Sequence, residues 1–71
     1  MTVEEMKQEI SRQKINHHDK VEIRNKIGER LSGLIILEGY SLWIGGVYFI
    51  RNNFPNEQYI SLDQIIQIIK K

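Results

Sequence analysis

The chain of 71 residues contains no cysteine, no alanine and a single proline. Without cysteine it can form no disulfide, no thiolate nucleophile and no cysteine-ligated zinc site, and it suits a reducing compartment such as the cytoplasm. The lack of alanine beside thirteen isoleucines disfavours an all-helical protein and favours β-strands. The length predicts one domain spanning residues 1–71.

Long apolar runs are also lacking. The longest candidate, residues 31–50, is interrupted by Glu38 and by four glycines, whereas a membrane helix needs roughly 18–20 apolar residues. The acidic and polar start, residues 1–9, is unlike a secretory signal. We therefore expect a cytoplasmic protein with no membrane partner.

Signatures of catalysis and of cofactors are lacking as well. There is no G-x-x-x-x-G-K-[ST] loop for phosphates, and no serine lies near an evident base. The neighbouring His17 and His18 would point to opposite faces of a strand, so they do not predict a shared metal ion. We expect no enzyme activity, no metal and no cofactor.

The charge is nearly balanced, with ten basic and nine acidic residues. This argues against a polycationic nucleic-acid arm but allows a local basic patch. The core of so small a domain seldom supplies more than about 3–5 kcal/mol, so we expect the chain to oligomerise.

The first segment is predicted to be a helix over residues 2–14. Thr2 and Glu5 have the spacing of a capping box, in which each side chain bonds the backbone of the other. Met6 and Ile10 belong to a narrow apolar stripe that recurs every three or four residues. Because this stripe is too thin for a core of its own, we expect the helix to lie on a larger β-structure.

From residue 20 the apolar period changes to two, which is typical of half-buried strands. Gly33 lies inside the second predicted strand and indicates a sharp bend. Gly45 and Gly46 predict a bulge in the third strand. The predicted strands begin at residue 20 and then cover residues 30–38, 42–50, 58–62 and 65–69, with a turn at 26–29 and a loop at 51–57.

The last segment is ambiguous. Residues 61–64 also fit a capping box, and the isoleucines at 65–69 fit a helix as well as a strand. Four isoleucines in five positions favour a strand. The helical alternative would give an α–β–β–α regulatory domain that dimerises.

The spacing V-x-I-x4-G-x2-L-x-G, formed by Val21, Ile23, Gly28, Leu31 and Gly33, resembles the first motif of Sm-like proteins. The Hfq branch is the most similar, because it has one helix directly before this strand. The resemblance implies a mostly β fold with an N-terminal helix, built as a small five-stranded Sm-like or SH3-like barrel. It further implies a ring, most often of six copies, in which the fourth strand of one copy pairs with the fifth strand of the next.

The resemblance also implies that single-stranded, U-rich or A-rich RNA is the partner, and that the protein acts as an RNA chaperone or post-transcriptional regulator. Three groups of residues would bind it. The helix face comprises Gln8, Gly39, Tyr40, Ser41, Asp63 and Gln64. The opposite face comprises Arg24, Gly28, Glu29, Arg30, Leu31, Ser32 and Gln67, and the rim comprises His17 and His18.

The chain departs from the Hfq pattern in two places. Leu62 and Asp63 stand where that branch has a lysine-histidine pair, and the stretch between Tyr40 and Gln58 is several residues longer. An alternative function is a protein-interaction adaptor, an SH3-like barrel with a peptide groove formed by Tyr40, Trp43 and Tyr48.

Overall fold

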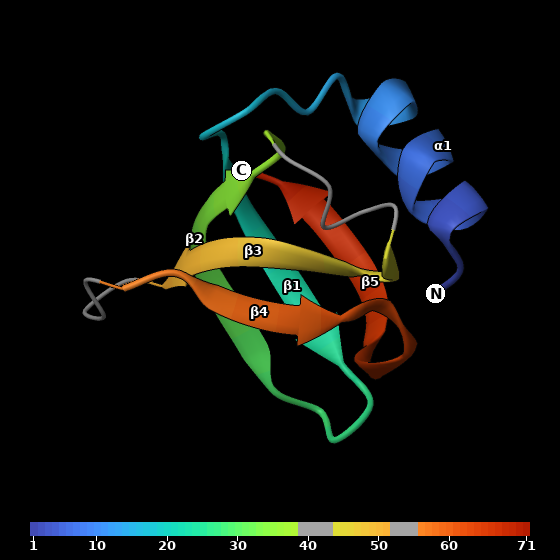
Figure 1. Cartoon of the computed structure of the whole chain (residues 1–71), viewed down its shortest axis with the longest axis vertical. Helices are drawn as coiled ribbons and strands as arrows, with labels where there is room; N and C mark the ends of the chain where they lie inside the picture. The colour runs from blue at the N-terminus through green and yellow to red at the C-terminus, as the bar shows by residue number, and fades with distance from the viewer. Residues whose placement is uncertain (39–43, 52–55) are drawn as a thin grey trace.

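The computed structural model describes residues 1–38, 44–51 and 56–71. The described residues include one α-helix, five strands and the short 3-10 turn η2 (Figure 1). Their bounds are α1 (Val3–Gln13), β1 (Lys20–Asn25), β2 (Arg30–Ile36), β3 (Gly46–Arg51), β4 (Gln58–Ser61), η2 (Leu62–Gln64) and β5 (Ile65–Lys70). Among the described residues there is no helix long and apolar enough to span a membrane.

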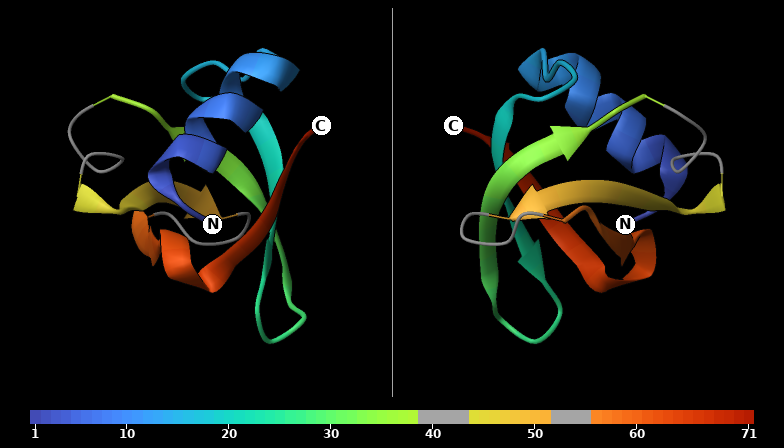
Figure 2. Two further views of the ribbon diagram at one scale, coloured as in Figure 1. Left: turned by 90° about the vertical axis from the view of Figure 1, so that its right-hand side faces the viewer. Right: turned by 60° about the vertical axis from the view of Figure 1, so that its left-hand side comes forward.

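The strands form one antiparallel sheet in the order β4-β3-β2-β1-β5. The expected mostly β fold with an N-terminal helix and five strands is confirmed. The expectation of a closed barrel is wrong, because β4 and β5 are the two edges of the sheet and pair with β3 and β1 instead. β4 has only four residues, and η2 then turns the chain so that β5 runs along β1. The sheet curls around the core without closing (Figure 2).

The helix begins as predicted. Glu5 N–H donates to Thr2 Oγ1 over 3.1 Å, and Thr2 N–H donates to the Glu5 carboxylate over 3.0 Å, which completes the capping box. Helix α1 lies beside β5 and buries Met6 completely (Figure 1). The core that it covers is lined by Ile15, Val21, Ile23, Ile35, Val47, Phe49, Leu62, Ile65 and Ile68.

Gly33 is required by the close approach of two strands. It pairs with Arg51 of β3, and a Cβ at this position would overlap the backbone of Ile50. The predicted bend at Gly33 therefore corresponds to a place where β3 crosses β2 too closely for any side chain.

Some predicted boundaries are wrong. The third strand begins at Gly46, since Ile44 and Gly45 lie in a turn with Gly45 at φ +87°. The bulge expected there is absent from the regular β3–β4 register over residues 46–49, and the register shift lies instead between Arg24 and Asn25. The second strand ends two residues early, at Ile36, and most of the predicted loop lies outside the described residues.

The ambiguous C-terminal segment is a strand. Ile65, Ile68 and Ile69 pair with β1, and the first two are fully buried. The α–β–β–α alternative is therefore wrong. Strand formation here follows from β-branched side chains that fill the core next to Val21 and Ile23.

Candidate nucleic-acid interface

Three polar residues from the sequence prediction form a row across three strands. Arg24 of β1 is directly opposite Arg30 of β2 on one side and Gln67 of β5 on the other. Directly paired residues of a sheet project to the same face. Because the neighbouring Ile23 is fully buried, the row Arg30–Arg24–Gln67 lies on the outer face of the sheet.

The next row on this face contains Ser32, Glu22 and Ile69. Glu22 is only 8% exposed and accepts from Arg24 Nε over 3.1 Å and from Lys71 Nζ over 3.3 Å. The hydrogen bond from Arg24 is the main reason why the pKa of the Glu22 carboxyl is lowered, with Lys71 adding to it. Glu22 therefore orients two cations beside each other on the sheet surface.

A pocket of about 240 Å³ adjoins these rows and is lined by Lys20, Val21, Ser32, Gly33 and Lys71. In the described part of the chain, Glu22 is the only carboxylate that pairs with any of the four cations around it. We name this surface the basic face and define it by six side chains around the outward-facing Glu22, which are Lys20, Arg24, Arg30, Ser32, Gln67 and Lys71.

The remaining residues predicted for this side lie elsewhere. Gly28 and Glu29 form the β1–β2 turn, where Gly28 has φ +87° and Glu29 is held by the Asn25 side chain. Leu31 is directly opposite the buried Ile23 and packs against the core, so it does not belong to the basic face.

The helix-face prediction is only partly represented in the structure. Asp63 and Gln64 are exposed on η2, where the Ser61 hydroxyl donates to Asp63 and lowers the pKa of that carboxyl. The predicted residues Gly39, Tyr40 and Ser41 lie outside the described residues, as does Trp43 of the alternative.

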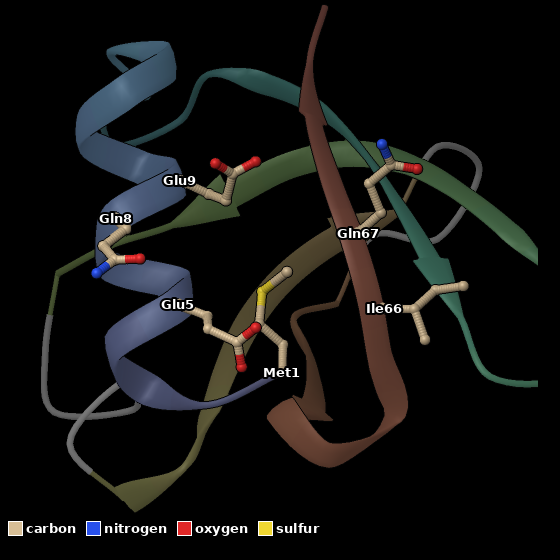
Figure 3. Close-up of a pocket in the computed structure, with 6 residues that line it drawn as sticks. All are labelled: Met1, Glu5, Gln8, Glu9, Ile66 and Gln67. Atoms are coloured by element: carbon tan, nitrogen blue, oxygen red, sulfur yellow. The ribbon is translucent and has the colours of Figure 1, made fainter.

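Gln8 lines a groove of about 400 Å³ between α1 and β5, and Gln67 lines the same groove (Figure 3). Glu5 and Glu9 project into it from α1. Thr2 N–H lowers the pKa of the Glu5 carboxyl, and the Arg12 hydrogen bond lowers that of Glu9. Because these carboxylates keep their charge, the groove is acidic and is a poor place for a phosphate.

The rim histidines stack on each other, with ring centroids 3.9 Å apart. His17 Nδ1 accepts from the N–H of Leu37 over 3.1 Å, so the proton of the neutral ring is on Nε2, which faces Glu38 at 3.8 Å. His17 therefore links the residue after β2 to the connection between α1 and β1. His18 is the exposed member of the pair.

An aromatic pair that the sequence prediction did not include among the RNA-binding residues lies on β3 and β4. Tyr48 and Tyr59 are directly opposite each other, with ring centroids 5.5 Å apart in an edge-to-face arrangement. They are 38% and 46% exposed, respectively. The Tyr59 ring lies against Gly46, where any Cβ would overlap it. The only sequence signal was their outward position in strands whose alternate residues are apolar.

The β5 edge is partly occupied by α1. The carboxamide of Gln13 donates to the Ile68 carbonyl over 2.8 Å and accepts from the Lys70 N–H over 2.7 Å. At the other end, the amino group of Met1 donates to the carbonyls of Leu62 and Ile65, each over 3.0 Å. These bonds satisfy backbone groups that an added strand would use.

The described residues contain no group of three histidine, aspartate or glutamate side chains that could hold a metal ion. Comparison of the chain with protein-family models, curated proteins and solved structures finds no match.

Proposed function

We propose that this protein is a ring-forming, Sm-like RNA-binding protein of the Hfq-like kind, which binds single-stranded RNA through the basic face. The observation that carries the proposal is the direct pairing of Arg24 with Arg30 beside Gln67. Like charges directly opposite each other in a sheet are destabilising, and Glu22 bonds only Arg24 of this pair, so the Arg30 guanidinium has no carboxylate partner in the described part of the chain. A bound phosphate offsets the repulsion.

The chemistry of the row suits single-stranded RNA. Guanidinium groups bind phosphates through paired hydrogen bonds and also stack on bases. The Gln67 carboxamide offers both a donor and an acceptor to a base edge. Single strands expose these edges, whereas duplex RNA hides them in a deep groove. We infer a role as an RNA chaperone or post-transcriptional regulator.

The two unpaired sheet edges support ring assembly. β4 and β5 each end the sheet, and an exposed edge is a template for pairing with another chain. Pairing of β4 in one copy with β5 in the next, repeated around a closed ring of about six, removes all of these edges. A partner strand that runs the full length of β5 must exchange its bonds for those made by Gln13.

The test combines light scattering with titration of fluorescent uridine and adenine oligomers. The variant Arg24→Gln/Arg30→Gln is expected to weaken RNA binding at least about tenfold and to reduce its salt dependence by up to about two counterions. Arg12→Gln is a control for the loss of a positive charge, because it removes one cation from an exposed site on α1 (Val3–Gln13), where Arg12 bonds Glu9. A monomeric wild-type protein, or equal affinity in the double variant and wild type, would contradict the proposal.

A protein-interaction adaptor is the second candidate function, and the exposed Tyr48–Tyr59 pair favours it. Aromatic residues on a small β-domain form grooves for proline-rich peptides. The same titration distinguishes the two functions, because an adaptor binds neither RNA oligomer, whether or not Arg24 is present.

A further inference from the structure

The hydrogen-bond ladder between β1 and β2 ends on a side chain. The register of these strands, continued toward α1, would pair His17 with Leu37, and the N–H of Leu37 would then donate to the His17 carbonyl. The N–H of Ile35 still has such a partner, the Asp19 carbonyl, at 3.1 Å. The N–H of Leu37 instead donates to Nδ1 of the His17 ring over 3.1 Å. An imidazole nitrogen thus replaces the last main-chain acceptor of the ladder.

The local backbone explains why a side chain is needed at this point. The chain turns at residues 17 and 18, with His18 at φ +68° in the left-handed region. The N–H of Asp19 donates back to the Asn16 carbonyl over 3.0 Å, so strand geometry ends there. The partly buried N–H of Leu37 still requires an acceptor. The ring of His17 supplies it.

This acceptor exists only while the His17 ring is neutral. Because Nδ1 accepts from Leu37, the single ring proton is on Nε2, which faces the Glu38 carboxylate at 3.8 Å. An imidazolium carries a proton on both nitrogens, so no rotation of the charged ring restores an acceptor. Imidazole is also the side chain that ordinarily changes charge between pH 5 and 8. Acid therefore places two N–H donors against each other.

The charged groups around His17 do not offset this loss. Glu38 already faces the Nε2 proton of the neutral ring, and its side chain is 81% exposed, so water and salt screen the attraction that it adds. The ring of His18 is stacked on His17 with centroids 3.9 Å apart, and two stacked imidazolium ions repel each other. Asp19, the carboxylate of this connection, is engaged by Lys70 of β5 at 3.4 Å.

We propose that His17 is a pH-operated latch, which holds Leu37 to the α1–β1 connection when its ring is neutral and releases it when the ring is protonated. The released form binds one proton more than the latched form, so a falling pH favours release. Leu37 is the first residue after β2, and its side chain packs against the core. Release therefore loosens the start of the β2–β3 connection and exposes apolar surface. The latch requires neither the ring nor RNA, so it is independent of the proposed function.

Amide hydrogen exchange, followed by NMR, tests the latch. Protection of the Leu37 amide is measured at about pH 8 and about pH 5, the two ends of the range in which imidazoles change charge. The Ile35 amide is the internal reference, because its acceptor is a carbonyl that does not titrate. Protection of Leu37 relative to Ile35 is expected to fall about tenfold at the lower pH. A ratio that stays the same at both values would overturn the proposal.

Two substitutions of His17 separate the acceptor from its charge. His17→Asn places Oδ1 where Nδ1 was, since both atoms are bonded to Cγ, and an amide oxygen keeps accepting at either pH. The Leu37 amide should then stay protected at both values. His17→Leu has no acceptor, so Leu37 should exchange rapidly at both. If His17→Leu does not fold, His17→Asn still decides, because a pH response that survives in it would contradict the latch.

His18→Asn is the matched control, because asparagine tolerates the left-handed conformation at this position. The variant removes the stacked ring and keeps His17, so the pH response of the Leu37 amide should persist. Loss of the response in His18→Asn would assign it to His18 and overturn the latch at His17.

Discussion

The Gln13 carboxamide accepts a hydrogen bond from the backbone N–H of Lys70 over 2.7 Å, and thereby attaches the end of α1 to the free edge of β5. The same carboxamide donates to the Ile68 carbonyl. Lys71 N–H donates to Lys20 on β1, and alternate residues of an antiparallel strand turn their backbone groups to opposite sides. The Ile68 carbonyl and the Lys70 N–H are thus the backbone groups with which a neighbouring strand would pair. By bonding both of them, Gln13 blocks strand pairing at this part of the β5 edge.

Replacing Gln13 by leucine is expected to remove both hydrogen bonds from the β5 edge and leave its backbone groups unpaired. The Lys70 amide loses its acceptor and should exchange with deuterium faster, as measured by NMR on dilute protein. The proposed ring should form at lower protein concentration, because assembly would no longer have to break these bonds. Gln8→Leu is the control, since Gln8 lines the adjacent groove. An unchanged deuterium exchange rate at the Lys70 amide would show that Gln13 does not block the β5 edge in solution.

Gly33→Ala is expected to destabilise the fold by about 3 kcal/mol, at the upper end of overpacking costs. Its Cβ would overlap the backbone of Ile50, which cannot move aside as a flexible side chain could. Gly28→Ala is the comparison, because its Cβ meets no atom within 4 Å and only the positive φ opposes it, at a cost of about 1 kcal/mol. Urea denaturation measures the free energy of unfolding of both variants. Equal losses of this free energy in the two variants would contradict the crowding at Gly33.

Met6→Ala is expected to cost about 2–5 kcal/mol, because Met6 is fully buried and its truncation leaves a cavity under α1. The exposed Ile27, at 77%, is the control, and its change to alanine should have little effect. If Met6→Ala lowered the free energy of unfolding only slightly, in thermal or urea denaturation, the sheet would be shown to fold without the helix.

Stability is expected to fall in acid. Hydrogen bonds from Arg24 and Lys71 lower the pKa of the Glu22 carboxyl, and the Asn16 N–H lowers that of Asp19. The unfolded chain then binds more protons than the folded chain at low pH. The contribution of Glu22 to the free energy of unfolding is therefore complete above its ordinary pKa of 4.5, and it is lost as the pH falls through the lower pKa of the folded state. Unfolding measured from pH 7 to pH 3 should show the loss.

Glu22→Gln should make this acid-induced loss shallower, because one of the contributing carboxylates is gone. Glu4→Gln is the matched control, because Glu4 is an exposed helix residue with no such cation cluster around it. An identical slope in wild type and Glu22→Gln would contradict the role of the Arg24–Glu22–Lys71 cluster.

Local features of the fold were predictable from residue patterns. The Thr2–Glu5 capping box predicted the start of α1, and the period of two from Val21 onward predicted strands with one buried face. The bend predicted at Gly33 corresponds to a real close approach. In each case the determining contact lies within a few residues or follows from the alternation of a strand.

The candidate site was predictable only in part. Arg24, Arg30 and Gln67 were named as one surface, and the sheet register places them in one row. The aromatic pair and the role of Gln13 were not foreseen, because both depend on segments that are brought together only in the folded chain.

By itself, the sequence determined where the helix and most strands form and which side chains are apolar on one face. These properties arise from backbone sterics, capping and side-chain alternation between near neighbours. Only the tertiary structure decided that β4 and β5 (Ile65–Lys70) stay unpaired with each other and that Gln13 covers part of one edge. Strand pairing is a competition among distant segments for the same backbone groups, and the packing of the whole core decides it.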